Sequence, residues 1–212
     1  MTYAVVVPTV GRPTLTALLD SLAASHGPLP AHVVVVDDRP DQVALDGPAG
    51  LAALPAPPPR LVEVLVVRRG GGRGPAAARN VGWRAVGQSC EWIVFLDDDV
   101  VVSQDWLSEL ADDLQQPADV AGVQGEITVP LPRDRRPTDW ERSTAGLQTA
   151  AWITADMGYR RPVLEQLGGF DERFPRAFRE DADIALRVQR CGGRLVRGRR
   201  RTTHPVRSVD RW

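Results

Sequence analysis

The sequence predicts an α/β domain with a mostly parallel central sheet that is flanked by helices. Four short apolar segments are rich in valine and isoleucine and show no polar alternation, which is typical of strands buried on both faces of a sheet. Helical patterns lie between the first and second segments and between the third and fourth, and such alternation builds parallel sheets. The four predicted strands cover Tyr3 to Val7, Val33 to Val36, Leu61 to Val67 and Trp92 to Leu96.

The helices are predicted from leucine and alanine spacing and from the residues that start and stop helices. Pro13 to Ala24 carries leucines at helical spacing behind a proline suited to the first turn, and Pro75 to Val86 is alanine-rich. Ser103 is expected to cap a helix with one apolar stripe that ends before Pro117. The remaining predicted elements are a strand at Glu126 to Val129 and helices at Arg161 to Leu167 and Glu180 to Arg190.

Length and composition bound the class of protein. The 212 residues suffice for one large domain, so we expect a single domain over residues 1–212. A formal net charge of -1 argues against a nucleic-acid partner, because no overall positive field attracts a phosphate backbone. Arginine still clusters locally, which indicates either solvated loops or attraction for phosphate groups. The clusters are Arg68-Arg69, Arg133 to Arg136 and Arg197 to Arg201.

Cysteine usage and hydropathy indicate the compartment. The two cysteines, Cys90 and Cys191, lie far apart, which argues against a disulfide framework or a structural zinc site and favours a reducing environment. The first residues lack the features of a signal peptide, and no apolar run approaches the roughly 20 residues that cross a bilayer. We therefore expect a cytoplasmic protein without a transmembrane segment, which can still dock peripherally on a membrane.

Polar residues follow each of the four predicted strands at the point where the strand ends. They are Pro8-Thr9, Asp37-Asp38, Arg68-Arg69 and Asp97 to Asp99. Ligands of open α/β sheets bind beyond the carboxyl ends of the strands. The sequence therefore predicts one cleft that all four strand ends border.

The acidic run Asp97-Asp98-Asp99 is the strongest single signal. Three adjacent carboxylates repel one another, and a divalent cation such as Mg²⁺ or Mn²⁺ removes that cost. Asp97 and Asp99 point to the same side of an extended segment, so they can share one ion. The alternative is an exposed acidic turn without a metal.

Three further features each allow a structural and a functional interpretation. Asp38 either accepts hydrogen bonds from a base or ribose or simply closes a turn. Glu180 and Asp181 begin a predicted helix, where acidic residues favour the helix dipole, but either can serve as a general base. His204 is either incidental or completes the metal shell. The run of glycines at Gly70 to Gly74 lacks the ending of a Walker site and indicates a tight turn instead.

Taken in order, these motifs resemble those of family 2 glycosyltransferases of the GT-A fold. The resemblance spans roughly residues 3 to 205. It rests on the segments VVVPTVGR, VVVVDDRP, GPAAARNVG, FLDDDV, LGGFDERF and REDADIALR, followed by a late histidine in THP. It implies a GT-A domain whose nucleotide-binding part covers about residues 1–102 and whose acceptor and catalytic part covers about residues 103–212.

The resemblance also implies roles for individual residues. The implied nucleotide-sugar ligands are Pro8, Thr9, Asp38, Arg79, Asp97, Asp98 and Asp156, the last through a sugar hydroxyl. Asp99 resembles the main metal ligand of a D-x-D motif, joined by Asp97 and, in some relatives, by the late histidine, here His204. Asp181 is the implied catalytic base, paired with Glu180, and Arg187 matches an arginine common after that pair.

The implied reaction moves a sugar from a UDP-, GDP- or dTDP-sugar to an unidentified acceptor hydroxyl with inversion and with Mn²⁺ or Mg²⁺. Two alternatives stay open. A nucleotidyltransferase shares the sheet and the metal carboxylates but is expected to carry a glycine- and lysine/arginine-rich loop after the first strand, where this chain reads PTVGRPT. An inactive nucleotide-sugar-binding module would keep the fold without turnover.

Overall fold

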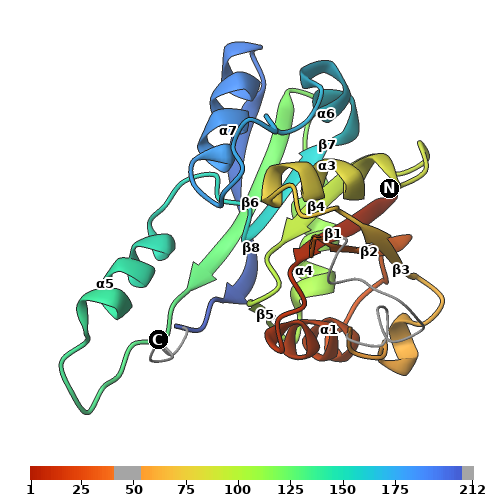
Figure 1. Cartoon of the computed structure of the whole chain (residues 1–212). Coiled ribbons are helices and arrows are strands. Elements are labelled where there is room, and N and C mark those ends of the chain that lie inside the picture. The colour runs from red at the N-terminus through yellow and green to blue at the C-terminus, as the bar shows by residue number, and fades with distance from the viewer. Residues whose placement is uncertain (41–53, 207–212) are drawn as a thin grey trace.

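The computed structural model describes residues 1–40 and 54–206, and these form one eight-stranded sheet with the order β3-β2-β1-β4-β7-β6-β8-β5 (Figure 1). The strands are β1 Tyr3–Thr9, β2 His32–Asp37, β3 Leu65–Arg69, β4 Trp92–Leu96, β5 Val101–Val102, β6 Val120–Thr128, β7 Asp156–Arg160 and β8 Arg194–Thr203. The helices are α1 Thr14–Ala24, α3 Pro75–Arg84, α4 Trp106–Asp113, α5 Asp139–Ala145, α6 Arg161–Leu167 and α7 Glu180–Arg190. Two 3-10 turns cover Pro59–Leu61 and Gly146–Gln148.

Strand direction divides the sheet into two regions. β3, β2, β1 and β4 run parallel to one another, as predicted. Beyond β4 the pairing is mixed, because β7 is antiparallel to both β4 and β6, β8 is parallel to β6, and β5 is antiparallel to β8. The prediction of a mixed α/β domain with a central sheet flanked by helices is confirmed, with the parallel character concentrated in the N-terminal half.

The sheet separates two hydrophobic cores, and β1 contributes to both. Val5 and Val7 pack on one face with the leucines of α1 and with α4. Val6 packs on the other face with α3, where Gly82 approaches so closely that an added Cβ would lie 2.3 Å from Val6 Cγ1. A strand that is buried on both faces needs apolar residues at every position, which explains the unbroken valine run.

Several predicted helix boundaries are confirmed. α6 covers Arg161–Leu167 and ends at Gly168, which has the left-handed conformation (φ 73°) of a helix C-cap. α7 covers Glu180–Arg190. The glycine run makes the predicted tight turn, since Gly71, Gly72 and Gly74 have φ angles of 82°, 71° and 93° before Pro75 opens α3.

The prediction that Ser103 caps a helix is wrong. α4 begins at Trp106 with Asp105 at the N-cap, and no side chain caps the helix. The Trp106 amide instead donates to the backbone carbonyl of Ser103 at 3.1 Å, which makes a turn ahead of the helix. The Ser103 hydroxyl is buried and makes no hydrogen bond among the described residues.

The C-terminal strands were the part of the fold that sequence patterns missed. β6 begins six residues before the predicted Glu126, and β7 was not predicted. The arginine cluster Arg197 to Arg201, for which the sequence indicated no strand, lies in β8, Arg194–Thr203, the longest described strand. The predicted third strand is shorter than expected, because Leu61 belongs to a 3-10 turn and β3 begins at Leu65.

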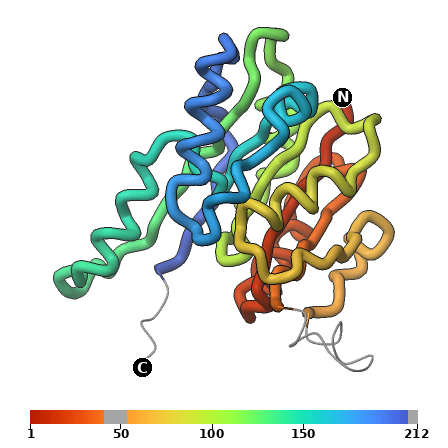
Figure 2. The backbone as a smooth tube through the Cα atoms, turned by 45° about the horizontal axis from the view of Figure 1, so that its top comes forward, coloured from red at the N-terminus to blue at the C-terminus, as the bar shows by residue number. Residues whose placement is uncertain are grey.

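α5 differs from the other helices because it buries none of its residues. Together with the loop before it, the helix projects from the body of the molecule (Figure 2). A capping box between Thr138 and Glu141 fixes its first turn.

None of the described helices combines the length and apolar character needed to cross a bilayer. Both cysteines are free, with Cys90 buried and Cys191 exposed.

Candidate active site

A cavity of about 690 Å³ opens at the carboxyl ends of β1, β2 and β4. Its wall is completed by Leu147, by Ile153 to Ala155, by the loop before α7 and by His204 after β8. The predicted site residues that line it are Pro8, Thr9, Asp38, Arg79, Asp97, Asp98, Asp99, Glu180, Asp181 and His204. Residues spread over nearly the whole chain therefore meet in one place, as the positions of the strand ends predict. Arg68 and Arg69 at the end of β3 do not line the cavity, and the loop after β3 borders it through Gly72 and Gly74 instead.

Asp98 ties the loop after β1 to the acidic segment after β4. Its side chain is 1% exposed, and its two oxygens accept from Thr9 Oγ1 at 2.6 Å and from Arg12 Nη1 at 2.7 Å. Burial raises the pKa of Asp98, although the bonds from Thr9 and Arg12 oppose this shift. Asp98 therefore orients Thr9 and Arg12 at the cavity wall.

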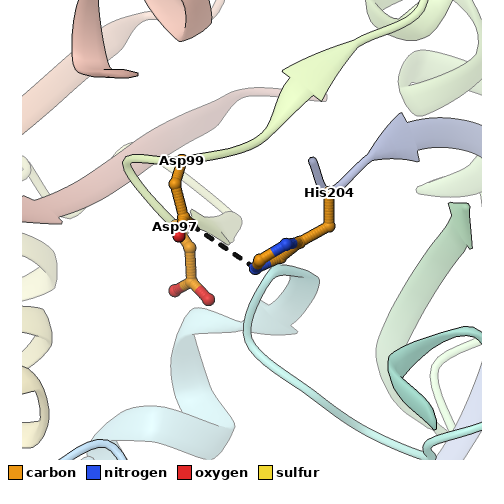
Figure 3. Close-up of side chains that lie close together, drawn as sticks. All are labelled: Asp97, Asp99 and His204. Atoms are coloured by element: carbon orange, nitrogen blue, oxygen red, sulfur yellow. Dashed lines mark ion pairs between the residues drawn. The ribbon is translucent and has the colours of Figure 1, made fainter. Parts of the chain in front are cut away.

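Asp97, Asp99 and His204 form a candidate metal centre. One ligand atom of each residue lies within 4.8 Å of those of the other two, and His204 Nε2 is 3.5 Å from Asp99 Oδ1. Figure 3 shows the two aspartates on the loop after β4 facing the imidazole, which comes from the end of β8. Two carboxylate oxygens and one imidazole nitrogen fit a divalent cation.

The backbone around His204 holds its ring in place. Its amide donates to the Thr128 carbonyl at 2.8 Å, which extends the pairing of β8 with β6. His204 Nδ1 lies 3.2 Å from the Pro205 carbonyl. A proton on Nδ1 would bond this carbonyl and leave the Nε2 lone pair for an ion, which is the usual arrangement of a metal-binding histidine.

Arg79 connects the acidic loop to the start of α7. It is 3% exposed, and its guanidinium donates to Asp97 Oδ1 at 2.8 Å and to Glu180 Oε1 at 2.9 Å. Burial by itself lowers the pKa of Arg79, but the two carboxylates outweigh burial and raise it. Arg79 thus stays charged and fixes both acidic groups.

Asp181 follows Glu180, and no arginine of the described residues forms an ion pair with it. Its Oδ1 accepts from the Ala182 amide at 2.7 Å. Burial raises the pKa of Asp181, and the negative charges of Glu180 and Asp97 raise it further. Of the two predicted catalytic carboxylates, Asp181 therefore has the environment of a proton acceptor, whereas Glu180 is held by Arg79.

Asp38 shapes the glycine-rich turn. Its Oδ1 accepts from the Arg73 amide at 3.1 Å and its Oδ2 from the Gly74 amide at 2.8 Å. Gly70 is required for this approach, because a Cβ there would lie 2.4 Å from Asp38 Oδ1. Burial raises the pKa of Asp38 against the effect of these amides. The carboxylate lines the cavity while it holds the loop that leads into α3.

The expectation that Asp156 binds a sugar hydroxyl is not met by the geometry. Asp156 is 0% exposed and does not line the cavity. Its oxygens accept from Trp106 Nε1, Arg200 Nε and Thr202 Oγ1. Arg187 also lies outside the cavity lining, where it bonds Asp183 and the Gly169 carbonyl and so joins α7 to the end of α6.

Sequence reasoning missed three cavity-lining arginines. Arg12 ends the motif VVVPTVGR, in which only Pro8 and Thr9 were assigned to the site. Arg176 and Arg179 lie in the loop before α7 and have no anionic partner among the described residues. Arg179 has a φ of 71°, an uncommon conformation for a residue with a side chain that is often found at functional sites. Its position next to the acidic pair was the available signal.

Comparison with known proteins decides the family. Residues 4–183 match the model described as glycosyl transferase family 2. The chain belongs to this family. A curated relative, the O-antigen biosynthesis protein RfbC of Myxococcus xanthus, is 30% identical over 146 residues that cover 54% of this chain and 11% of that protein. The pre-mycofactocin glycosyltransferase of Mycobacterium tuberculosis is 27% identical over 63% of this chain and 30% of its own length. The chain thus spans less than a third of the length of either glycosyl transferase family 2 relative.

Solved structures share the fold of this glycosyl transferase family 2 chain, which is GT-A. The mannosyltransferase PcManGT from Pyrobaculum calidifontis, in complex with GDP-Man and Mn²⁺, is 24% identical with a TM-score of 0.68, over 98% of this chain and 57% of that one. GalNAc-T7 with UDP, GalNAc and Mn²⁺ is 17% identical with a TM-score of 0.72, over 99% of this chain and 44% of that one. S. aureus TarS 1-349 in complex with UDP is 20% identical with a TM-score of 0.63, over 97% and 61%.

Proposed function

We propose that the chain transfers a sugar from a nucleotide-diphosphate donor to an acceptor hydroxyl, with inversion and with a divalent cation. The observation that carries the proposal is the shared cavity. Asp97, Asp99 and His204 form a ligand set there. Asp181 lines the same space, and its carboxylate is not ion-paired with any arginine in residues 1–40 and 54–206. One cavity thus offers a cation site and a proton acceptor.

The divalent cation is part of the proposal. Asp97, Asp99 and His204 would hold Mn²⁺ or Mg²⁺, and the two solved neighbours with Mn²⁺ support this choice without separating the two ions. When bound, the cation supplies positive charge that stabilises the departing nucleoside diphosphate. Arg79 holds Asp97 at 2.8 Å, which limits the movement of that ligand.

Asp181 acts as the base in this mechanism. Its carboxylate takes the proton of the acceptor hydroxyl as the acceptor oxygen forms a bond to the anomeric carbon. The bond from that carbon to the diphosphate oxygen breaks, and the nucleoside diphosphate leaves with the electron pair. Attack from the side opposite the leaving group inverts the anomeric centre. Glu180 does not take the proton in this proposal, because its bond to Arg79 engages the carboxylate.

The donor binds along the ends of β1 and β2. Pro8, Thr9 and Asp38 line that part of the cavity, and the carboxylate of Asp98 orients Thr9 and Arg12. Solved neighbours hold UDP, UDP-GlcNAc or GDP-Man, which supports a UDP-, GDP- or dTDP-sugar as the donor class here. A small change in the pocket can redirect the preference for base or sugar, so the donor class stays broad.

Arg176 and Arg179 complete the proposed donor site. The other cavity arginines are ion-paired, Arg12 with Asp98 and Arg79 with Asp97 and Glu180. Arg176 and Arg179 have no such partner among the described residues, so their charge is available for the diphosphate. Arg173 offers a comparison in the same loop, because it is 91% exposed and already paired with Asp171 at 2.7 Å.

Product analysis tests the proposed function. The chain is incubated with Mn²⁺ and a panel of UDP-, GDP- and dTDP-sugars, with a mixture of glycans as acceptors. Release of nucleoside diphosphate together with a new glycoside of inverted configuration is expected. Pyrophosphate as the product would instead indicate nucleotidyl transfer. Binding of a nucleotide sugar without any turnover would indicate a binding module.

The proposal extends to cellular location, nucleic-acid binding and membrane docking. We propose a cytoplasmic location, because nucleotide sugars are handled there, and we expect no nucleic-acid partner at a net charge of -1. Peripheral docking on a membrane is compatible with the proposal. Fractionation of cells that express the tagged chain checks the location, and a pellet that releases the chain at high salt would indicate electrostatic docking.

A further inference from the structure

The two parts of the candidate metal centre follow different strands of the sheet. Asp97 and Asp99 follow β4, whereas His204 follows β8. In the sheet order, β7 and β6 separate these two strands. The segment after Asp99 does pair with β8, since Val101 and Val102 of β5 lie opposite Thr203 and Thr202. This pairing brings the two parts close, and side-chain contacts on β8 then set the position of the imidazole.

Asp156 stands between the two parts. Its backbone is paired with Leu96, the residue directly before Asp97. Its side chain accepts from Thr202 Oγ1 at 2.6 Å and from Arg200 Nε at 2.7 Å, both on β8. One residue thus contacts the strand that carries the aspartates through its backbone and the strand that carries the histidine through its carboxylate.

The residues on β8 that bind Asp156 lie on the same face as His204. Side chains alternate along a strand, so Arg200, Thr202 and His204 point to one side. Arg200 and Thr202 are both 0% exposed, so their contacts with Asp156 are shielded from solvent. The contact to Thr202 lies two residues before the imidazole, so it fixes the strand close to the metal centre.

Gly125 on β6 makes this contact possible. The carboxylate of Asp156 crosses β6 on its way to β8, and a Cβ at position 125 would lie 2.4 Å from Asp156 Oδ2 and 3.1 Å from Arg200 Cγ. The pairing of β6 with β8 is irregular between Gln124 and Glu126, at the same point. Because Gly125 has no side chain, the buried ion pair between Asp156 and Arg200 can lie over β6 at this position.

Helix α4 anchors the network from the other direction. Trp106 Nε1 donates to Asp156 Oδ2 at 2.7 Å. Asp113 accepts from Arg200 Nη1 at 3.1 Å and from the Arg199 amide at 2.8 Å. Placing two carboxylates and one guanidinium in a core costs desolvation free energy. Hydrophobic residues of similar size often give a protein equal or greater stability. Such a network in this position suggests a role beyond stability.

We infer that Asp156, Arg200 and Thr202 form a clamp that positions His204 against Asp97 and Asp99, so that Asp156 is a positioning residue of the metal centre. The inference rests on the proposed function, because it assumes that His204 binds the cation. Outer residues that orient metal ligands commonly change metal affinity by about 10- to 100-fold when they are removed. The clamp acts on the cation through the position of the imidazole alone.

The test measures the affinity of the full 212-residue chain for Mn²⁺ alone, from the EPR signal of the free ion. Thr202→Val keeps the shape of the side chain and removes its hydroxyl donor, and we expect affinity to fall about tenfold. Thr203→Val is the matched control, because Thr203 is next along the strand and its hydroxyl pairs with Thr128 at 3.2 Å, away from the clamp. The control is expected to bind Mn²⁺ like the parent chain.

A double-mutant cycle separates positioning from general destabilisation. His204→Ala should weaken Mn²⁺ binding, and Thr202→Val should then add nothing in the His204→Ala background. Equal losses from Thr202→Val in both backgrounds would overturn the clamp. Thr202→Val with parent affinity, while His204→Ala binds weakly, would also overturn it and leave the proposed function intact.

The remaining outcome concerns the proposed function itself. Parent affinity in His204→Ala would remove the histidine from the metal centre and the clamp with it. Asp156→Asn provides a second variant of the clamp, since it keeps the shape and removes the charge. A thermal unfolding scan accompanies each variant, and Thr202→Val alone decides the inference if Asp156→Asn fails to fold.

Discussion

The two halves of the sheet hold together in different ways. In the N-terminal half, β1 and β2 are continuous valine runs that are buried on both faces. In the C-terminal half, β8 reads RLVRGRRRTT, and its most buried side chains include Arg200 and Thr202. The strands of the first half are held mainly by apolar contacts, whereas the second half adds a buried polar network to its apolar core. The cavity lies where they meet, and each half supplies part of the candidate site.

Replacing Asp181 should have the largest effect on transfer. Asp181→Asn is expected to lower kcat about 10³-fold, since a positioned general base contributes about 10²- to 10⁴-fold. Steady-state release of nucleoside diphosphate measures this change. Asp183→Asn is the control, because Asp183 lies on the same helix but pairs with Arg187 at 2.8 Å outside the cavity lining. Similar losses in both variants would indicate damage to α7 rather than loss of a base.

Removing Arg200 tests whether the C-terminal half depends on its buried charge. Arg200→Ala leaves Asp113 and Asp156 without their cation, and the loss of one partner from a buried pair costs about 3–5 kcal/mol of unfolding free energy. Arg199→Ala, next to it and exposed, should change stability by less than about 0.5 kcal/mol. Urea unfolding of both variants makes the comparison. Equal stability would mean that apolar contacts alone hold β8.

Truncating one apolar side chain measures the corresponding loss of unfolding free energy in the N-terminal half. Leu18 of α1 is fully buried against β1, so Leu18→Ala should cost about 2–5 kcal/mol through lost contacts and a cavity. This loss should vary little with salt, since no charge is involved. Urea unfolding at two ionic strengths measures it. A strong salt dependence would mean that the two halves are not as different as their compositions suggest.

The unpaired arginines of the loop before α7 should have a smaller effect. Arg176→Ala and Arg179→Ala are each expected to weaken binding of UDP or GDP in Mn²⁺ about tenfold, as a charged hydrogen bond contributes about 1.5–3 kcal/mol. Calorimetric titration measures the affinity. Arg173→Ala, whose parent side chain is already paired with Asp171, should bind like the parent chain. Unchanged nucleotide binding in all three variants would contradict a role in donor binding and would indicate that the arginines contact the acceptor instead.

The smallest expected effect is a shift in pH dependence. An ordinary aspartate has a pKa of about 3.9. Burial raises the pKa of Asp181, so its carboxylate takes up a proton at a higher pH than an ordinary aspartate does. The acidic limb of kcat should therefore lie above that value. Ionised Asp181 disfavours the folded state above its folded pKa, so Asp181→Asn should be slightly more stable than the parent at neutral pH. Below the unfolded pKa this difference should vanish, and thermal scans at both pH values check it.

The same contrast explains what the sequence could predict. Apolar runs, proline at a helix start and glycine at a helix end all act locally, so β1, β2, β4, α6 and α7 were predicted closely. Asp97, Asp99 and Asp181 were found because acidic residues follow a strand or open a helix. β8 was missed because its strand character depends on Asp156 and Asp113, which lie far away in the chain.

Asp156 shows why a residue's role is harder to predict than its position. Its neighbours in the sequence suggested contact with a donor sugar, and nothing local indicates Arg200 or Thr202 as partners. A buried aspartate on a strand between apolar residues was the available signal, since such a group needs partners. Arg12 was missed for the opposite reason, because its partner Asp98 had already been assigned to the nucleotide.

The central claim is that two segments far apart in the chain hold one cation beside Asp181. Anomalous diffraction at the manganese edge, from crystals grown with Mn²⁺ and a nucleoside diphosphate, tests it most directly. The account predicts one strong peak within coordination distance of Asp97, Asp99 and His204, with the diphosphate on its open side. A manganese peak elsewhere, or a bound diphosphate with no manganese next to these three residues, would contradict it.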